Sequence, residues 1–169
     1  KLFRLKKSKK ELAFIAHMAD VVSLAGLGDV INQYFGGFLV KRKSSCKFKA
    51  IKIPIRDKSV YCRYFGPIDK KAIISKNNKK INDAGIKALN KIKNLNKKDL
   101  DLADLIKISK QFSISSGLLQ NKSVVKTIKN IEKNNGNASM IMLGNSVFSD
   151  KYFKGSKKLL ISDKPARLL

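Results

Sequence analysis

The sequence predicts an α+β (mixed α/β) fold, because strand patterns stand before and after a helical block. Short runs rich in β-branched and aromatic residues come early, three stretches with helical apolar spacing fill the middle, and further apolar runs close the chain. Of the 169 residues 43% are hydrophobic, which is typical of a folded chain rather than a disordered one. A chain of this length buries roughly two-thirds of its unfolded surface and folds without disulfides or a structural metal.

The first helix is expected to begin at Ser8, because Ser8 and Glu11 have the spacing of a capping box. An apolar stripe at helical spacing follows, made of Leu12, Ile15, Ala16, Ala19 and Val22. The segment 25–29 contains two glycines and predicts a tight turn. A short segment over 30–35 comes next, and then Gly36-Gly37, where another group can approach the backbone closely.

Three early strands are predicted, over 38–40, 50–55 and 60–65. Three helices are predicted in the middle, over 81–95, about 100–113 and about 123–133, each with one apolar face. The run 138–143 predicts a buried strand, Gly144-Asn145 a turn, and 147–149 and 159–161 two further strands.

The net charge of +25 arises from 37 Lys and Arg against 12 Asp and Glu. Only five of the cations are Arg, and the lysines come with much Asn and Ile, which favours a composition bias over a nucleic-acid surface. A polyanion-binding surface and a membrane-surface role are the weaker alternatives. The segments 1–10 and 41–52 each carry six positive charges and no acid, and form either a solvated edge or a positive rim near a phosphate-bearing ligand.

Several classes of protein are disfavoured by counts. Two cysteines, Cys46 and Cys62, are too few for a disulfide framework, and a single histidine, His17, excludes a histidine-based metal cage. No apolar run approaches the roughly 20 residues that span a bilayer. With no visible signal peptide, we expect a cytoplasmic protein with no membrane association.

The most informative stretch is 17–42. Asp29 directly follows Gly26-Leu27-Gly28, so its carboxylate is expected on a sharp, exposed turn, as a base or charge anchor facing a ligand. The alternative is that Asp29 only caps the helix that starts at Val30.

This stretch resembles the centre of a GHMP-superfamily kinase, and most closely the archaeal pantoate kinases. The matching residues run from Ala16-His17 through Asp20, Gly26–Val30, Gln33 and Gly36-Gly37 to Arg42, and continue with Gly66–Asp69, Ser139-Met140, Met142–Asn145, Val147-Phe148 and 166–169. The resemblance covers nearly the whole chain. It implies a two-layer GHMP-kinase fold, with 1–58 as the end of the N-terminal domain and 59–169 as a ferredoxin-like C-terminal domain.

The implied activity is transfer of the ATP γ-phosphoryl group to the primary hydroxyl of pantoate, a step towards coenzyme A. Asp29 matches the superfamily's catalytic Asp. Asp20 stands where the family usually has Glu, a position associated with Mg²⁺. The resemblance implies the following further residues: Arg42, Gln33 and His17 for substrate binding, and Gly28, Gly144, Asn145 and Ser139 near the nucleotide phosphates.

Alternatives remain for two of these. His17 shares a helix face with Asp20, three residues on, and is also compatible with a partly buried, hydrogen-bonded role. Arg42 suits a substrate carboxylate through its guanidinium fork, and equally an exposed surface position.

The sequence departs from the family pattern at several points. Ala25 replaces a common Thr, 43–47 replaces a Pro-Gly-rich loop, and Lys70 replaces another common Thr. No Gly-rich phosphate loop occurs in 1–25, so we expect the C-terminal part of a kinase that is inactive alone. A Lys-rich nucleic-acid-binding module and a kinase relative without catalysis are the alternatives. Nucleic acid is not the favoured partner, and a homodimer stays open.

Overall fold

The computed structural model describes residues 6–23, 28–41, 50–55, 57, 59–68, 70–95 and 101–166. Within these residues it has five helices and two antiparallel sheets, so the predicted α+β class is confirmed. The chain divides into two compact units, one formed by Lys1–Pro54 with Ser162–Leu169 and the other by Ile55–Ile161. The predicted domain boundary at 58 and 59 stays a prediction. No helix in the described parts of the chain is long and apolar enough to cross a membrane.

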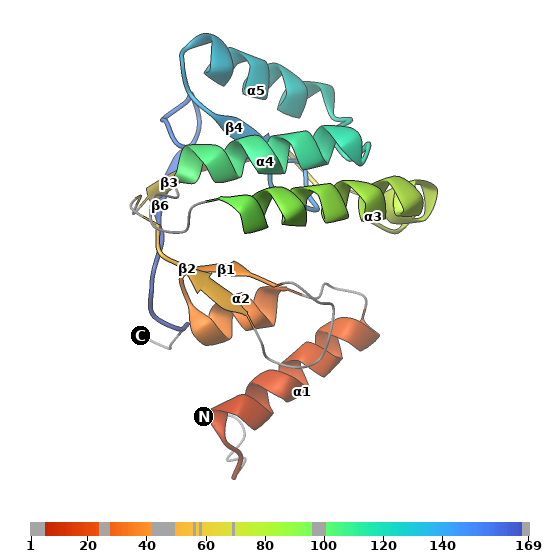
Figure 1. Cartoon of the computed structure of the whole chain (residues 1–169), viewed down its shortest axis with the longest axis vertical. Helices are drawn as coiled ribbons and strands as arrows, with labels where there is room; N and C mark the ends of the chain where they lie inside the picture. The colour runs from red at the N-terminus through yellow and green to blue at the C-terminus, as the bar shows by residue number, and fades with distance from the viewer. Residues whose placement is uncertain are drawn as a thin grey trace. The chain divides into compact units, whose positions relative to one another are not determined.

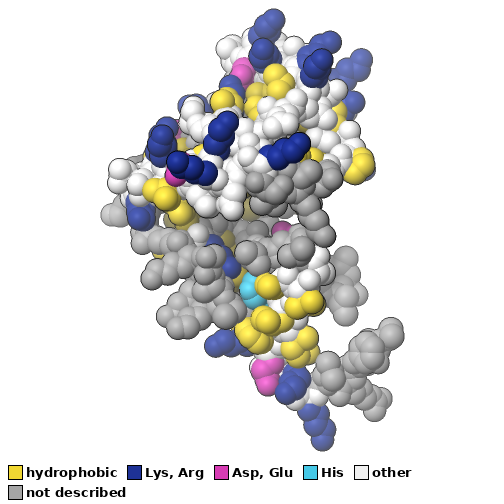
Figure 2. All heavy atoms as spheres, turned by 90° about the vertical axis from the view of Figure 1, so that its right-hand side faces the viewer, with side chains coloured by type: hydrophobic (Ala, Val, Ile, Leu, Met, Phe, Trp, Pro, Cys, Tyr) yellow, Lys and Arg dark blue, Asp and Glu magenta, His cyan; other side chains and the backbone are white. Residues whose placement is uncertain are grey.

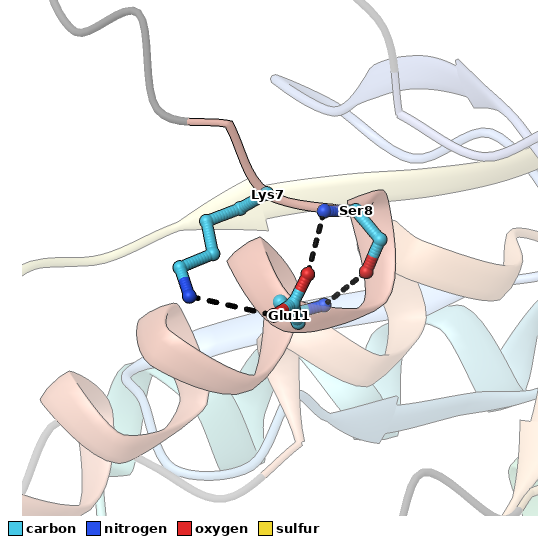
Figure 3. Close-up of polar contacts among 3 residues, drawn as sticks. All are labelled: Lys7, Ser8 and Glu11. Carbon is cyan, nitrogen blue, oxygen red and sulfur yellow. Dashed lines mark hydrogen bonds and ion pairs between the residues drawn. The ribbon is translucent and has the colours of Figure 1, made fainter.

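The first unit begins with α1 (Lys9–Val22), which starts where the capping box predicted. The Ser8 hydroxyl accepts a hydrogen bond from the Glu11 backbone N–H at 3.2 Å, and the Ser8 backbone N–H donates to the Glu11 carboxylate at 2.7 Å (Figure 3). Two of the backbone N–H groups left free at a helix start are thereby satisfied. The predicted apolar stripe lies along this helix, but most of it is exposed: Leu12, Ile15 and Val22 are all solvent-accessible.

Helix α2 (Asp29–Phe35) packs against α1, and β1 (Phe38–Val40) pairs antiparallel with β2 (Ile51–Ile53). Gly36 and Gly37 connect α2 to β1 with φ of +63° and +78°. The group that approaches Gly36 closely is the backbone of Lys164 and Pro165 in the chain's own C-terminal segment, and the group nearest to Gly37 is the Lys52 side chain. The Gly37 N–H donates to Ser162 O at 2.6 Å, and the Ala166 N–H donates to Gln33 O at 2.7 Å. These bonds tie the end of the chain to the end of α2.

The second unit contains a four-stranded sheet in the order β4-β5-β3-β6. Its strands are β3 (Ser59–Tyr64), β4 (Ala138–Met140), β5 (Ser146–Ser149) and β6 (Lys157–Leu160). All neighbouring strands are antiparallel, and β3 lies between β5 and β6. This is the strand order of a ferredoxin-like sheet. In the described segment 150–156, turns and bends join β5 to β6 where that fold usually has a helix.

Three helices connect β3 to β4: α3 (Lys70–Asn94), α4 (Leu102–Ser115) and α5 (Lys122–Lys133). Helices α4 and α5 contact the sheet directly, and α3 lies along α4 (Figure 1). The core between α5 and the sheet is formed by Leu118, Val124, Ile128, Ile131, Ala138, Met140 and Val147. The apolar faces predicted for α4 and α5 are confirmed as the inward ones, and on α3 the buried residue of the predicted face is Ala84.

Two predictions for this unit were wrong in their bounds. The first middle helix spans 25 residues and begins at Lys70, well before the predicted start at 81. The predicted strand 138–143 ends at Met140, and Ile141 and Met142 are exposed. The reason is that the Ile141 N–H donates to Ser146 O at 3.0 Å, which closes a wider hairpin loop than the Gly144-Asn145 turn expected from sequence.

Candidate active site

The residue that carries the functional hypothesis, Asp29, is the first residue of α2 and is exposed. Gly28 occupies the N-cap position, so Asp29 is not the residue that caps the helix. Within the described part of the chain, the Asp29 carboxylate makes no hydrogen bond. A carboxylate in the first turn of a helix interacts favourably with the helix dipole.

Gln33 lies one turn further along α2 and is also exposed. Residues four apart on a helix occupy the same face, so Gln33 and Asp29 share one face of α2. The Gln33 backbone carbonyl accepts the hydrogen bond from Ala166 described above, and this bond leaves the Gln33 side chain available. The two side chains together offer an acceptor and a donor to one small polar molecule.

His17 and Asp20 lie on α1, the helix that packs against α2. His17 is 3% exposed, while Asp20 is half-buried. The two share a helix face because they are three residues apart. The burial of His17 agrees with the structural alternative for this residue, whereas contact with a substrate stays a prediction. α1 and α2 thus bring four of the predicted site residues into one unit.

Of the residues predicted to lie near the phosphates, Gly28 belongs to the first unit as the N-cap of α2, and Gly144, Asn145 and Ser139 belong to the second unit. Asn145 is fixed to the segment that follows β3. Its side-chain Nδ2 donates a hydrogen bond to Pro67 O at 2.7 Å, and its backbone carbonyl accepts one from the Phe65 N–H at 2.7 Å. Ser139 is fully buried in β4, where its hydroxyl bonds to the Ser109 hydroxyl at 3.1 Å. In the structure Ser139 therefore joins the sheet to α4, and a role near a phosphate stays a prediction for it.

A small pocket of about 90 Å³ adjoins this turn. Gly144 and Asn145 form one side of it, and other parts of its lining come from Ile68, Leu119, Gln120 and Asn121. The sequence analysis did not single out Gln120 and Asn121. One signal in the sequence could have pointed to Asn121. It stands just before the apolar run of α5, where an Asn is typical of an N-cap and therefore of the end of a surface loop.

Arg42 and the Gly26-Leu27 dipeptide lie outside the described residues. Within the described residues no group of three or more His, Cys, Asp or Glu side chains could hold a metal ion. Mg²⁺ in phosphoryl-transfer sites is commonly held by one or two carboxylates together with substrate phosphates. Asp20, whose carboxylate has no hydrogen bond in the described residues, fits a site of that kind.

Comparison with known proteins gives this geometry a context. No family model matches the sequence. The chain is 31% identical over 151 residues to a pantoate kinase from Methanocaldococcus jannaschii, a match that covers 88% of this chain and 54% of that protein. It is 27% identical over 148 residues to a pantoate kinase from Methanospirillum hungatei, covering 88% of this chain and 48% of that protein. The chain spans about half the length of the curated relatives it matches.

A solved structure described as a phosphotransferase related to the CoA biosynthesis pathway agrees with these matches. It superimposes with a TM-score of 0.70 at 25% identity and covers 85% of this chain and 46% of that one. A sequence match over 88% of the chain must include both the block at 26–30 and the block at 139–145. The resemblance expected from these motifs is confirmed, and over most of its own length the chain is similar to the pantoate kinases.

Proposed function

We propose that this chain supplies the Asp29-bearing part of an ATP-dependent kinase that phosphorylates the primary hydroxyl of pantoate in coenzyme A biosynthesis. The observation that carries the proposal is the 31% identity with a pantoate kinase across both motif blocks. The exposed position of Asp29 at the start of α2 supports it, because a general base must face its substrate.

In the proposed reaction the pantoate hydroxyl oxygen forms a bond to the γ-phosphorus of ATP. The bond from that phosphorus to the β–γ bridging oxygen breaks, and ADP leaves with the electron pair. Asp29 orients the hydroxyl and accepts its proton, so that 4-phosphopantoate forms. Phosphoryl transfer of this kind depends mostly on positioning and on neutralising phosphate charge, which leaves little covalent chemistry to the protein.

Substrate binding is proposed for three residues. Gln33, beside Asp29 on α2, donates a hydrogen bond to a hydroxyl or carboxylate oxygen of pantoate. Arg42 pairs with the pantoate carboxylate through its two-pronged guanidinium group. His17 acts from the neighbouring helix α1, where it is 3% exposed.

The phosphates of ATP are proposed to lie near Gly28, Gly144, Asn145 and Ser139. Asp20 supplies one oxygen ligand for Mg²⁺, which when bound would neutralise charge on the β- and γ-phosphates. The basic segments 1–10 and 41–52 add a positive field that raises the encounter rate with ATP and an anionic acceptor. A cytoplasmic location follows from this function, because ATP and the reactions leading to coenzyme A are found there.

The test is a kinase assay on the complete enzyme, in which this chain is joined to the part of the kinase that it does not match. We expect ATP-dependent formation of 4-phosphopantoate, detected by phosphorus NMR. Homoserine and mevalonate serve as alternative acceptors handled by the same superfamily. Equal turnover of either alcohol would overturn the choice of pantoate, and the absence of phosphorylation of every acceptor would overturn the kinase function. The chain by itself should show little or no turnover.

A further inference from the structure

One face of α1 carries large apolar side chains that are exposed to solvent. The exposed fractions are 42% for Phe14, 51% for Ile15, 40% for Met18, 37% for Val21 and 80% for Val22. At 100° per residue these five side chains fall within an arc of roughly 120°, so they form one continuous strip rather than scattered contacts. In Figure 2 hydrophobic side chains gather on this helix at the bottom of the view. We call these five residues the outer face of α1.

The outer face is not used in packing α1 onto its neighbour. Helix α1 contacts α2, and the buried residue of α1 is His17, which lies beside the strip rather than within it. An apolar strip that covers about a third of the helix circumference along roughly two and a half turns is costly to leave in water. A contiguous exposed patch of this kind marks an interaction site. We therefore expect a binding partner at the outer face of α1.

The described sheet of the first unit is also small. Its described strands, β1 and β2, form a sheet of only two strands. A two-stranded sheet is marginally stable alone and gains stability from additional strands or from packing. The relatives contain further polypeptide that can supply additional strands and packing, because the chain accounts for only 54% of one pantoate kinase and 48% of the other. The solved phosphotransferase likewise has more than half of its length outside the match.

We propose that the outer face of α1 docks the polypeptide that supplies the half of the pantoate-kinase fold which this chain does not match. The inference rests on the proposed function. The half-length match favours this occupant over a second copy of the chain. A second copy would repeat the matched half of the pantoate-kinase fold and would not supply the other half. The occupant presents a complementary apolar face to α1, and docking completes the first unit around Asp29.

The experiment mixes this full chain with the unmatched part of the Methanocaldococcus jannaschii pantoate kinase, expressed as a separate polypeptide. We expect a 1:1 complex by analytical ultracentrifugation. Amide hydrogen exchange across 14–22 should slow at least about tenfold on complex formation, since burial restricts local opening. The double variant Ile15→Ser with Val22→Ser should raise Kd about 30-fold or more, because two apolar side chains lose their burial.

A matched control comes from the second unit. Ile114 and Leu160 are 51% and 78% exposed, close to the values for Ile15 and Val22. The double variant Ile114→Ser with Leu160→Ser should leave Kd unchanged within about threefold. Circular dichroism of both double variants checks that each keeps its helical content, as expected for substitutions at exposed positions.

Several outcomes would overturn the docking proposal. These are no complex, equal weakening by both double variants, or slow exchange across 14–22 in the chain alone while it is monomeric. A self-association of the chain that the Ile15→Ser, Val22→Ser variant abolishes would make a second copy the occupant. The proposed function is tested separately by turnover of the complex. A complex without turnover removes the function and keeps the docking face, and turnover that the α1 variant leaves unchanged removes the docking face and keeps the function.

Discussion

Replacing Gly36 by Ala tests whether the C-terminal segment is locked against α2. Gly36 has φ +63° and ψ 169°, a combination that is essentially restricted to glycine. A Cβ at this position would overlap the carbonyl group of Lys164 and lie 2.9 Å from Pro165 N. Both neighbours are backbone atoms, so the clash cannot be relieved by turning a side chain.

The magnitude follows from two contributions. Holding a non-glycine residue in this backbone region costs about 2 kcal/mol. Moving segment 162–166 away breaks the hydrogen bonds from Gly37 to Ser162 and from Ala166 to Gln33, each worth about 1 kcal/mol. Together these give about 4 kcal/mol, which corresponds to about a thousandfold change in the equilibrium between docked and released segment.

The assay is amide hydrogen exchange measured by NMR on the full chain. In Gly36→Ala the protection of the Gly37 and Ala166 amides should fall about a thousandfold, or to none if the wild-type protection is smaller than that. Gly28→Ala is the control in the same unit, because its φ is −119° and nothing lies within 4 Å of the new Cβ. It should change protection by less than about tenfold, the scale of a weakened N-cap. Protection of the Gly37 amide in Gly36→Ala within tenfold of wild type would refute the reasoning.

Three further predictions concern single side chains. The Ser8 backbone N–H donates to the Glu11 carboxylate, which holds the pKa of Glu11 below its ordinary value of 4.5. Because the folded pKa is the lower one, this contribution to α1 is complete above the unfolded value and is lost as pH falls through the folded value. Glu11→Gln keeps the acceptor without titrating, so α1 helicity followed by circular dichroism should lose its acid dependence; an unchanged acid transition would contradict this. Ser139→Ala leaves the half-buried Ser109 hydroxyl without this partner and should lower the free energy of unfolding by about 0.5–1.5 kcal/mol in urea titrations. The double variant with Ser109→Ala should cost less than the two single changes added together, and strict additivity would show that the two hydroxyls are not coupled. Burial raises the pKa of the Cys62 thiol, so alkylation by iodoacetamide at pH 7 should be slower than for a small thiol and should accelerate on unfolding.

Local signals in the sequence predicted the local structure well. The Ser8–Glu11 spacing located the start of α1, and the apolar periodicity located α4 and α5, because each of these depends on residues within a few positions of one another. The strand predicted over 138–143 is too long, because β4 ends at Met140. The hydrogen bond from the Ile141 N–H to Ser146 O closes the loop that follows, and hydrophobicity alone does not encode this bond.

Long-range partners were the part that the sequence could not supply. Gly36-Gly37 was recognised as a place of close approach, but the approaching group is a segment more than 120 residues later in the chain. The apolar stripe of α1 was recognised too, yet its period is the same whether the stripe is buried or exposed. Of the candidate site, the positions of Asp29 and Gln33 on one helix face follow from spacing, whereas the pocket beside Asn145 depends on how separate elements meet.

The proposed role of Asp29 on the hydroxyl of pantoate is tested by comparing kcat of two variants in the complete kinase. Asp29→Asn keeps the shape of the side chain and removes its basicity, so kcat should fall by about 10²–10⁴-fold, the range typical of a lost general base. Asp83→Asn changes an equally charged, exposed residue on α3 and should leave kcat within about twofold of wild type. Near-normal turnover by Asp29→Asn, with a fold unchanged by circular dichroism, would contradict the account.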